Sequence, residues 1–214
     1  MALKAVVIPV TPFQQNCSLW WDETTLAATV VDPGGEVDRI LTAIGELKLV
    51  VSNIVLTHGH LDHAGGAMAL RDALPGTTPI IGPDERDRFL LDGLEAQGAQ
   101  YGIECRNVVP DRWLREGDSV ALGGVDFAVL HCPGHTPGHL AFVNQDLRLA
   151  VVGDVLFRGS VGRTDFPYGD HAALLAAIHG KLLPLGDDMA FLCGHGPGST
   201  FGHERQRNPF LRGD

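Results

Sequence analysis

Residues 57–66 read THGHLDHAGG and follow directly after a short apolar run of strand length. His58 and His60 are two positions apart just beyond this run, so in an extended backbone both imidazoles project to the same side. Glycines within and after the stretch allow the chain to turn sharply, which would return Asp62 and His63 toward the same point. Imidazole and carboxylate groups gathered in this way are typical metal ligands. The stretch therefore predicts a metal site in a loop at the end of a strand.

Three later segments have the same character, because in each a strand-like run ends in glycine beside a residue that can bind metal. They are CPGHTPGH with His135, VVGDVLF with Asp154 and LCGHGPG with His195. Loops at strand ends can gather side chains that are distant in the sequence, so we expect these residues to join the first stretch. His131 and His139 flank His135 and are expected to pack beside the site or support its ligands.

Short apolar runs rich in β-branched residues recur along the chain, each closed by Gly, Pro, Asp or Asn. They predict strands at residues 5–10, 27–31, 52–56, 125–130, 140–143, 149–152 and 189–192. Amphipathic spacing predicts helices at residues 36–47, 64–74, 84–97 and 171–183, and glycine-rich or polar turns are expected at residues 123–124 and 144–146. Clusters of strands with helices between them favour a mixed sandwich covered by helices over a purely parallel sheet. No linker or repeat interrupts the pattern, so we expect residues 1–214 to form a single domain.

The composition, with 44% hydrophobic and 20% charged residues, is that of a soluble globular protein. The formal net charge of −10 argues against nucleic acid as the main partner, because binding to its backbone normally needs a basic face. No apolar run approaches the length of a membrane span, and Pro9 and Pro12 interrupt the N-terminal apolar stretch before a signal-peptide core can form. The four cysteines form no C-x-x-C pair and are expected to be buried thiols. These features predict a cytoplasmic protein with neither a membrane nor a nucleic acid partner.

The motifs THGHLDHAGG, GHTPGH, VVGDVLF and CGHGP, in this order and spacing, resemble the metal motifs of the metallo-β-lactamase superfamily. The resemblance covers essentially the whole chain and implies an α/β (α+β) fold, the four-layer αββα sandwich, with the metals at one edge. It implies three ligands for one metal ion: His58, His60 and His135. It implies three for a second ion, with an aspartate bridging the two: Asp62, His63 and His195, bridged by Asp154.

Two further segments, GSVGRTDFPYGD at residues 159–170 and GHERQRNPF at residues 202–210, are similar to the short glyoxalase II-like, or hydroxyacylglutathione hydrolase-like, branch. This resemblance implies hydrolysis of a thioester, S-D-lactoylglutathione, to D-lactate and glutathione by a hydroxide that bridges two divalent metal ions. Asp62 would be the catalytic residue that orients the hydroxide and takes its proton. Histidine and aspartate ligands suit zinc, which we expect, and also iron or manganese. The resemblance also implies that true β-lactamases lack an aspartate at the position of Asp154. The presence of Asp154 therefore favours a hydroxyacylglutathione hydrolase-like enzyme over a true β-lactamase.

Two residues of the 159–170 segment are candidates for substrate binding. Arg163 stands where the two-domain glyoxalase II enzymes have a lysine that helps to hold glutathione, and it either contacts the substrate or pairs with Asp165. Tyr168 lies either over the mouth of the site or under the loop. Those enzymes add basic contacts from a C-terminal helical domain, for which we find no candidate here. We therefore expect a small-molecule thioester, either one derived from glutathione or one of a different thiol.

A mono-iron persulfide dioxygenase that acts on glutathione persulfide is the alternative function. Such enzymes share the fold, the GRTDF stretch and nearly all of the metal-facing residues. The resemblance implies that they bind one iron through residues that correspond to His58, His135 and Asp154. The continuation FPYGD and the GHGP motif around His195 favour the hydrolase.

Overall fold

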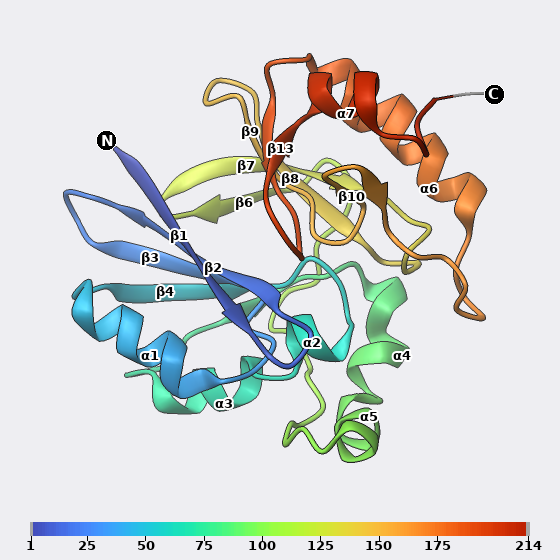
Figure 1. The fold of residues 1–214 in the computed structure, drawn as a ribbon. Helices are drawn as coiled ribbons and strands as arrows, with labels where there is room; N and C mark the ends of the chain where they lie inside the picture. The colour runs from blue at the N-terminus through green and yellow to red at the C-terminus, as the bar shows by residue number, and fades with distance from the viewer. Residues whose placement is uncertain (1, 213–214) are drawn as a thin grey trace.

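Two β-sheets pack face to face in the computed structural model, which describes residues 2–212 (Figure 1). The first sheet has the order β1-β2-β3-β4-β5, the second has the order β13-β12-β9-β8-β7-β6, and β10 and β11 form a separate ribbon. The strands of the first sheet are β1 Leu3–Val10, β2 Gln15–Asp22, β3 Ala27–Val31, β4 Val50–Val55 and β5 Ile80–Ile81. Those of the second are β6 Ser119–Leu122, β7 Val125–His131, β8 Leu140–Asn144, β9 Leu149–Val151, β12 Ala190–Leu192 and β13 Ser199–Thr200. The ribbon consists of β10 Leu156–Phe157 and β11 Ser160–Val161.

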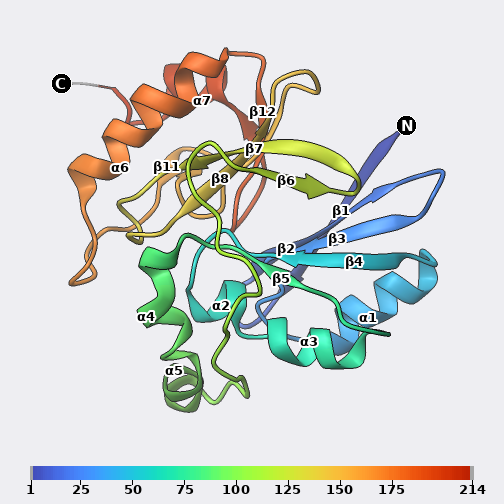
Figure 2. The same ribbon diagram turned by 180° about the vertical axis from the view of Figure 1, so that it is seen from behind.

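Helices cover the outer face of each sheet (Figures 1 and 2). α1 Val37–Glu46 and α3 Ala67–Ala73 lie against the first sheet, and α6 His171–Ala177 and α7 Phe201–Arg207 lie against the second. The remaining helical segments are α2 Leu61–Ala64, η1 Glu85–Asp87, α4 Arg88–Leu91, α5 Leu94–Tyr101, η2 Ile178–Leu182 and η3 Leu183–Leu185. The layers therefore follow the order helix, sheet, sheet, helix, and the expected αββα sandwich is confirmed.

Three hydrophobic clusters fill the spaces between these four layers. One lies between the two sheets and includes the fully buried side chains of Trp20 on β2 and Phe127 on β7, whose rings meet edge to face at 5.8 Å. A second joins the first sheet to α1 and α3, and a third joins the second sheet to α6 and α7. Burial of apolar area, worth about 25 cal/mol per Å², holds the layers together and leaves the strand ends free to carry the site.

Every strand predicted from the sequence is present, and so are both predicted turns, which join β6 to β7 and β8 to β9. The strand β2 was not predicted, because Gln15, Asn16 and Ser18 interrupt its apolar pattern although it is the second strand of the first sheet. The prediction of one helix over residues 84–97 is wrong. That region divides into η1, α4 and α5, because the backbone departs from α-helical geometry at Asp87 and again at Gly93.

Candidate metal centre

Four loops that follow β4, β7, β9 and β12 meet at one edge of the sandwich. Backbone hydrogen bonds tie these loops to one another across the sheets. The amide of Leu140 donates to the carbonyl of Thr57 at 2.9 Å, and the amide of Gly194 donates to the carbonyl of Gly153 at 2.8 Å. The segments that carry the predicted ligands are therefore held together by the backbone itself.

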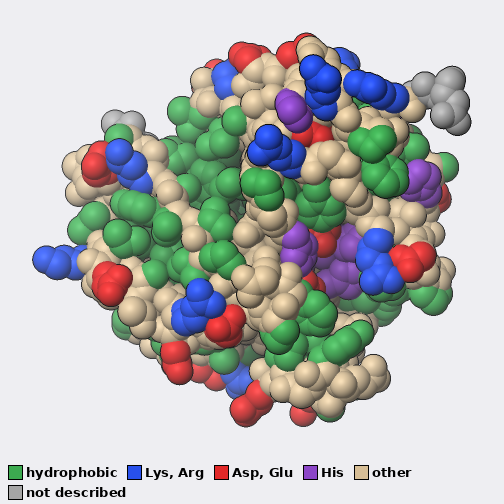
Figure 3. Space-filling model, in the orientation of Figure 1, with side chains coloured by type: hydrophobic (Ala, Val, Ile, Leu, Met, Phe, Trp, Pro, Cys, Tyr) green, Lys and Arg blue, Asp and Glu red, His purple; other side chains and the backbone are tan. Residues whose placement is uncertain are grey.

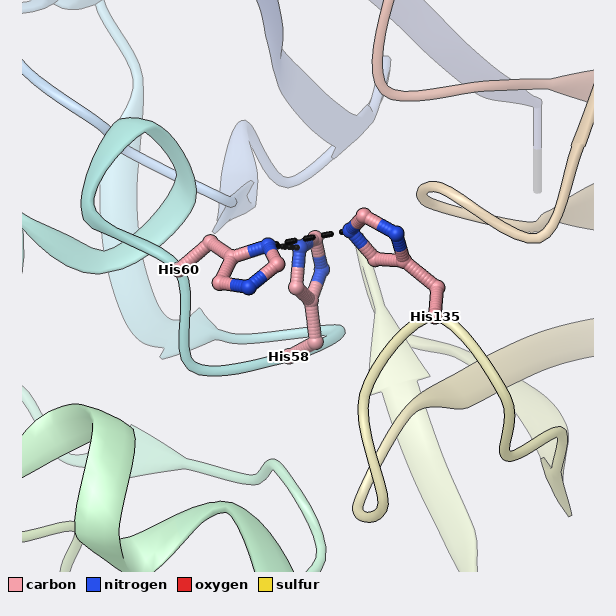
Figure 4. Close-up of side chains that lie close together, drawn as sticks. All are labelled: His58, His60 and His135. Carbon is pink, nitrogen blue, oxygen red and sulfur yellow. Dashed lines mark hydrogen bonds between the residues drawn. The ribbon is translucent and has the colours of Figure 1, made fainter. Parts of the chain in front are cut away.

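Three imidazoles converge to form the first group, which Figure 4 shows with their nitrogens turned toward one another. Nε2 of His58 lies 3.1 Å from Nδ1 of His60, and Nε2 of His135 lies 2.9 Å from the same Nδ1. Two nitrogens bound to one tetrahedral zinc ion lie about 3.3 Å apart, because each Zn–N bond is about 2.0–2.1 Å long. The spacing of the three nitrogens thus suits one cation.

Asp62, His63 and His195 form a second group beside the first. Nε2 of His195 lies 3.2 Å from Oδ2 of Asp62, and Nε2 of His63 lies 3.9 Å from the same oxygen. Asp154 stands between the groups, since its carboxylate oxygens lie 3.3 Å from Nε2 of His63 and 3.6 Å from Nε2 of His135. The structure therefore brings together all seven side chains that the sequence singled out, in two groups of three joined by one carboxylate.

The far nitrogen of each histidine is tied to an acceptor, which decides where the ring proton sits. The Thr57 hydroxyl donates to Asp32 at 2.6 Å and therefore accepts from Nδ1–H of His58 at 3.0 Å. Nδ1–H of His63 donates to the Asp32 carboxylate at 2.9 Å. Because a neutral imidazole carries one proton, Nε2 is the atom of each ring that would offer a lone pair to a cation at the centre.

Backbone carbonyls do the same for two more histidines. Nδ1–H of His135 donates to the carbonyl of Arg163 at 2.8 Å, and Nδ1–H of His195 donates to the carbonyl of Phe13 at 3.1 Å. A carbonyl can only accept, so these contacts fix the tautomer that presents Nε2 to the centre.

His60 is oriented the other way round. Its Nδ1 faces the first group, and its Nε2 lies 2.8 Å from the hydroxyl of Tyr168. Burial raises the pKa of Tyr168 to about 12, so the phenol remains protonated at neutral pH. The phenol accepts from Nε2–H of His60 and keeps its own proton for another acceptor.

The two groups differ in their affinity for protons. Burial, reinforced by neighbouring imidazoles, lowers the pKa of His60 to about 3 and that of His58 well below its usual range, so both are neutral ligands at pH 7. Burial also opposes a charge on His195 and His63, but the carboxylates beside them outweigh it. Hydrogen bonds to Asp154 and Asp62 raise the pKa of His195 to about 9, and the same carboxylates raise that of His63 well above its usual value. Without a metal, His63 and His195 therefore bind protons at the position where a cation would lie beside Asp62 and Asp154.

Two buried polar atoms at the centre have no hydrogen-bond partner among the described residues, namely Nε2 of His63 and Oδ1 of Asp154. Leaving such atoms without a partner costs about 1–3 kcal/mol each. Both point into the space between the two groups, 3.3 Å from each other. Histidine nitrogens and carboxylate oxygens are the donors that divalent zinc, iron and manganese accept, so the residues fit a pair of such cations.

Gly194 is needed for this arrangement because a side chain at its position would enter the centre. A Cβ there would lie 2.0 Å from Oδ1 of Asp154 and 2.6 Å from Cε1 of His63. Such contacts are far inside van der Waals distance, so the CGHGP motif requires its first glycine.

Sequence reasoning missed two aspartates that support the ligands. Asp32 holds His63 and Thr57 as described above, and it follows β3 directly. Asp87 is fully buried and links the loops of the first group by accepting from Gly59 N at 2.9 Å and Thr136 Oγ1 at 2.7 Å. Asp32 could have been suspected from its place at a strand end, whereas nothing in the sequence around Asp87 marks it.

The two histidines that flank His135 differ in role. His139 is fully buried, its Nε2 accepts from the backbone amide of Asp154 at 3.0 Å, and its ring stacks on His58 at 4.5 Å. His131 contacts Arg86 at the surface, 3.0 Å from its guanidinium. His139 therefore supports the centre, as expected, and His131 belongs to the outer surface.

A pocket of about 610 Å³ opens above the two groups. Figure 3 shows histidine side chains at the floor of a hollow in this face, with hydrophobic side chains around it. The walls are mostly apolar and include Phe13, Leu61, Tyr101, Phe157, Phe166 and Pro197. A volume of this size suits a small molecule of several hundred daltons.

Both predicted substrate-binding residues line this pocket. Arg163 pairs with Asp165 through two hydrogen bonds of 2.7 Å, and its guanidinium lies over the Phe166 ring at 4.5 Å. The Tyr168 ring stacks on Phe166, with ring centres 5.3 Å apart, and its hydroxyl reaches His60. Tyr168 thus lies at the site, where its hydroxyl contacts a proposed ligand.

Across residues 2–212 the structure contains no helix with the length and apolar character needed to cross a membrane.

The sequence signature of the Metallo-beta-lactamase superfamily matches residues 10–195. The chain is 48% identical to hydroxyacylglutathione hydrolase GloC of Haemophilus influenzae over 207 residues, which cover 96% of each protein. Among solved structures, it resembles BLEG-1 B3 metallo-beta-lactamase with a TM-score of 0.88 and 36% identity, over 98% of this chain and all of that one.

Two further solved structures resemble this chain, one of them with two iron ions bound. TTHA1623 in a di-iron-bound form matches with a TM-score of 0.85 and 38% identity, over 96% of this chain and 100% of that one. ETHE1 from Myxococcus xanthus matches with a TM-score of 0.75 and 27% identity, over 98% and 84% of the two chains. The expected resemblance to hydroxyacylglutathione hydrolase-like enzymes is confirmed by these comparisons.

Proposed function

Because this chain belongs to the metallo-beta-lactamase superfamily, we propose that it is a dinuclear metal-dependent hydrolase of S-D-lactoylglutathione, which it converts to D-lactate and glutathione. The observation that carries the proposal is the convergence of the seven proposed ligand side chains beneath one pocket. The similarity to a hydroxyacylglutathione hydrolase over nearly the full length of both chains supports this substrate.

Each group of three residues would hold one divalent cation, with Asp154 between them. His58, His60 and His135 would bind the first, and Asp62, His63 and His195 the second. When bound, such a pair of cations lowers the pKa of a water molecule and polarises a carbonyl group. We propose zinc as the cation, with iron or manganese as substitutes, since these ligands suit all three metals.

We propose that Asp62 accepts the proton of the attacking water. Its carboxylate lines the pocket, and its side chain is 19% exposed, so a substrate and a water can reach it. Burial opposes its ionisation, but His63 and a hydrogen bond from His195 outweigh burial and lower its pKa. The carboxylate is therefore ionised at neutral pH and can accept a proton from water as oxygen attacks the thioester carbon.

The remaining residues hold the substrate and assist the leaving group. Breaking the carbon–sulfur bond releases a thiolate, which leaves readily because thiols have a pKa near 8.5. The Tyr168 hydroxyl, which accepts from His60, keeps its own proton available to an acceptor in the pocket. The aromatic wall formed by Phe166 and Tyr168 excludes water from one side of the centre.

The test is a measurement of metal content together with two assays. We expect two metal ions per chain and rapid hydrolysis of S-D-lactoylglutathione, with both lost after chelation and restored by added zinc. A protein that binds two metals but leaves this thioester intact would contradict the proposed substrate. Nitrocefin should be assayed beside the thioester, because a solved relative is a B3 metallo-beta-lactamase.

A mono-iron persulfide dioxygenase is the second candidate, since the GRTDF stretch and the metal-facing residues also resemble those of such enzymes. Such an enzyme would need only the ligands that match His58, His135 and Asp154. Because dioxygenases of this kind carry nearly all of the same metal-facing residues, metal content and oxygen uptake distinguish the two functions. One iron per chain and oxygen uptake with glutathione persulfide would support the dioxygenase against the hydrolase.

We place the enzyme in the cytoplasm as a protein without nucleic acid or membrane partners. The four cysteines are free thiols, which suits a reducing compartment. Separation of cell fractions followed by immunoblotting would test this location.

A further inference from the structure

We propose that Arg158 binds a carboxylate of the substrate's thiol half and so selects thioesters of an anionic thiol. This inference rests on the hydrolase activity proposed above and names the residue that chooses among its substrates. Neither the metal motifs nor the expected substrate contacts of the 159–170 segment include this arginine.

The charge around the pocket is opposite to the charge of the whole protein. The chain has a formal net charge of −10, yet the charged residues that line the pocket outside the seven proposed ligands are Arg158 and Arg163. Among residues 2–212, no acidic side chain outside the metal centre lines the pocket, and the unpaired charge of Arg158 there favours an anion. The apolar walls between them suit the uncharged middle of such a molecule.

The two arginines are not equally available to a ligand. Nε and Nη2 of Arg163 each donate to the Asp165 carboxylate at 2.7 Å, so the charge of Arg163 is already paired. Within residues 2–212, no carboxylate lies at ion-pair distance from Arg158 and its side chain makes no hydrogen bond. Arg158 therefore has its full set of donors free for a carboxylate, which an arginine can bind through two parallel hydrogen bonds.

The backbone that carries Arg158 is held in place although the side chain is exposed. Arg158 and Gly159 form the turn between β10 and β11, where Gly159 adopts a φ of 76° that favours glycine. The Gly159 amide donates at 2.7 Å to the fully buried Glu204, which also binds Asn208 at 3.0 Å. A buried carboxylate is costly unless it is paired, so Glu204 and Asn208 from the 202–210 motif serve to fix this turn. An anchored turn reduces the entropy lost when a ligand is bound.

The position of the turn indicates how the two halves of the substrate would lie in the pocket. The Phe157 ring, next to Arg158, meets the His195 ring edge-on at 6.2 Å, so this arginine belongs to the His195 side of the pocket. The Arg163 backbone contacts His135, and Phe166 lies with it on the opposite side. The thiol half would therefore extend past His195 toward Arg158, and the acyl group would lie against Phe166.

The experiment compares a thioester with carboxylates and one without. Steady-state rates are measured with S-D-lactoylglutathione and with S-lactoyl-N-acetylcysteamine for the parent protein, Arg158→Gln and Arg158→Lys. A charge-assisted hydrogen bond at an exposed site lies at the low end of its range, about 1.5 kcal/mol, which corresponds to roughly tenfold in affinity. We expect Arg158→Gln to lower the ratio of kcat/KM for the two thioesters about tenfold, through KM, and Arg158→Lys to recover most of it.

A binding measurement separates this inference from the proposed activity. The affinity of the same proteins for S-methylglutathione, which has no thioester bond, is measured by calorimetry, and Arg106→Gln serves as a control with an exposed arginine that pairs with Asp72 outside the pocket. We expect Arg158→Gln to weaken binding about tenfold and Arg106→Gln to leave it unchanged. Equal affinity of Arg158→Gln and the parent would overturn the role of Arg158, even if the parent hydrolyses both thioesters. If the parent hydrolyses neither thioester, the proposed activity fails, and the affinities still decide the role of Arg158.

Discussion

Replacing Asp87 by alanine should destabilise the protein although Asp87 lies outside the group of proposed ligands. The carboxylate is fully buried and accepts three hydrogen bonds, from Gly59 N at 2.9 Å, Thr136 Oγ1 at 2.7 Å and Gly138 N at 2.5 Å. A buried donor left without its acceptor costs about 1–3 kcal/mol, so three donors amount to about 6 kcal/mol. Burial raises the pKa of Asp87 to about 6, so removing its charge at pH 7 recovers about 3 kcal/mol. The expected net loss is about 3 kcal/mol.

The same residue should leave a pH signature. The folded protein binds a proton at Asp87 more tightly than the unfolded chain does, because its pKa rises from 3.8 to about 6 on folding. The parent therefore gains stability from this group as the pH falls through about 6 toward 3.8, and the alanine variant cannot. The difference in stability between parent and variant should widen by up to about 1.4 kcal/mol per pH unit in that window.

Urea denaturation of the metal-free proteins at pH 5 and pH 7.5 measures both effects. Asp92→Ala is the matched control, because Asp92 is an exposed aspartate of the same segment and its loss should change stability by less than about 0.5 kcal/mol. A loss below about 1 kcal/mol in Asp87→Ala, or a difference that narrows as the pH falls, would refute this account of Asp87.

Three further predictions concern the centre itself. Gly194→Ala should abolish binding of the second metal, as measured by elemental analysis, because its Cβ would lie 2.0 Å from Oδ1 of Asp154; full metal content would contradict this. In Asp62→Asn protein that elemental analysis shows to hold both metals, kcat should be at least about a hundredfold lower, since proton transfer contributes about that much; an unchanged kcat in such protein would remove the catalytic role of Asp62. In the metal-free protein, His195 has its pKa raised from 6.5 to about 9, so its stabilising effect is present below pH 6.5 and is lost as the pH rises to 9. The melting temperature of the metal-free protein should fall in this window and that of the zinc-loaded protein should not; equal slopes would count against it.

The seven proposed ligands could be found from the sequence because their positions follow a local rule. Each stands within eight residues of the end of a strand that is apolar enough to recognise, and the sandwich brings those ends to one edge. The strand β2 could not be predicted because polar residues that interrupt its apolar pattern form hydrogen bonds with residues distant in the sequence. Asn16, for example, donates to the carbonyl of Cys193 at 3.0 Å, a contact across 177 residues that no local pattern reveals.

Asp87 shows why the supporting residues were harder to predict. It lies in a segment whose spacing suggests one continuous helix over residues 84–97, and as a helical residue it would carry no special meaning. Breaks at Asp87 and Gly93 divide the segment into η1, α4 and α5, and Asp87 accepts hydrogen bonds from two loops of the centre. Its role arises only from tertiary contacts, so sequence periodicity could not reveal it.

The histidine contacts divide into those that a substitution can remove and those that it cannot. His135 and His195 donate to the backbone carbonyls of Arg163 and Phe13, so exchanging either of these side chains leaves the acceptor in place. His58, His60 and His63 depend on side chains instead, through Thr57, Tyr168 and Asp32 respectively. A change at Arg163 should therefore affect the substrate more than the metals, whereas the loss of Asp32 deprives His63 of the acceptor that fixes its tautomer. Arg163 and Asp32 both lie outside the set of proposed ligands, but Arg163 would act on substrate binding and Asp32 on metal binding. Measuring the metal content of variants at the two positions distinguishes these roles.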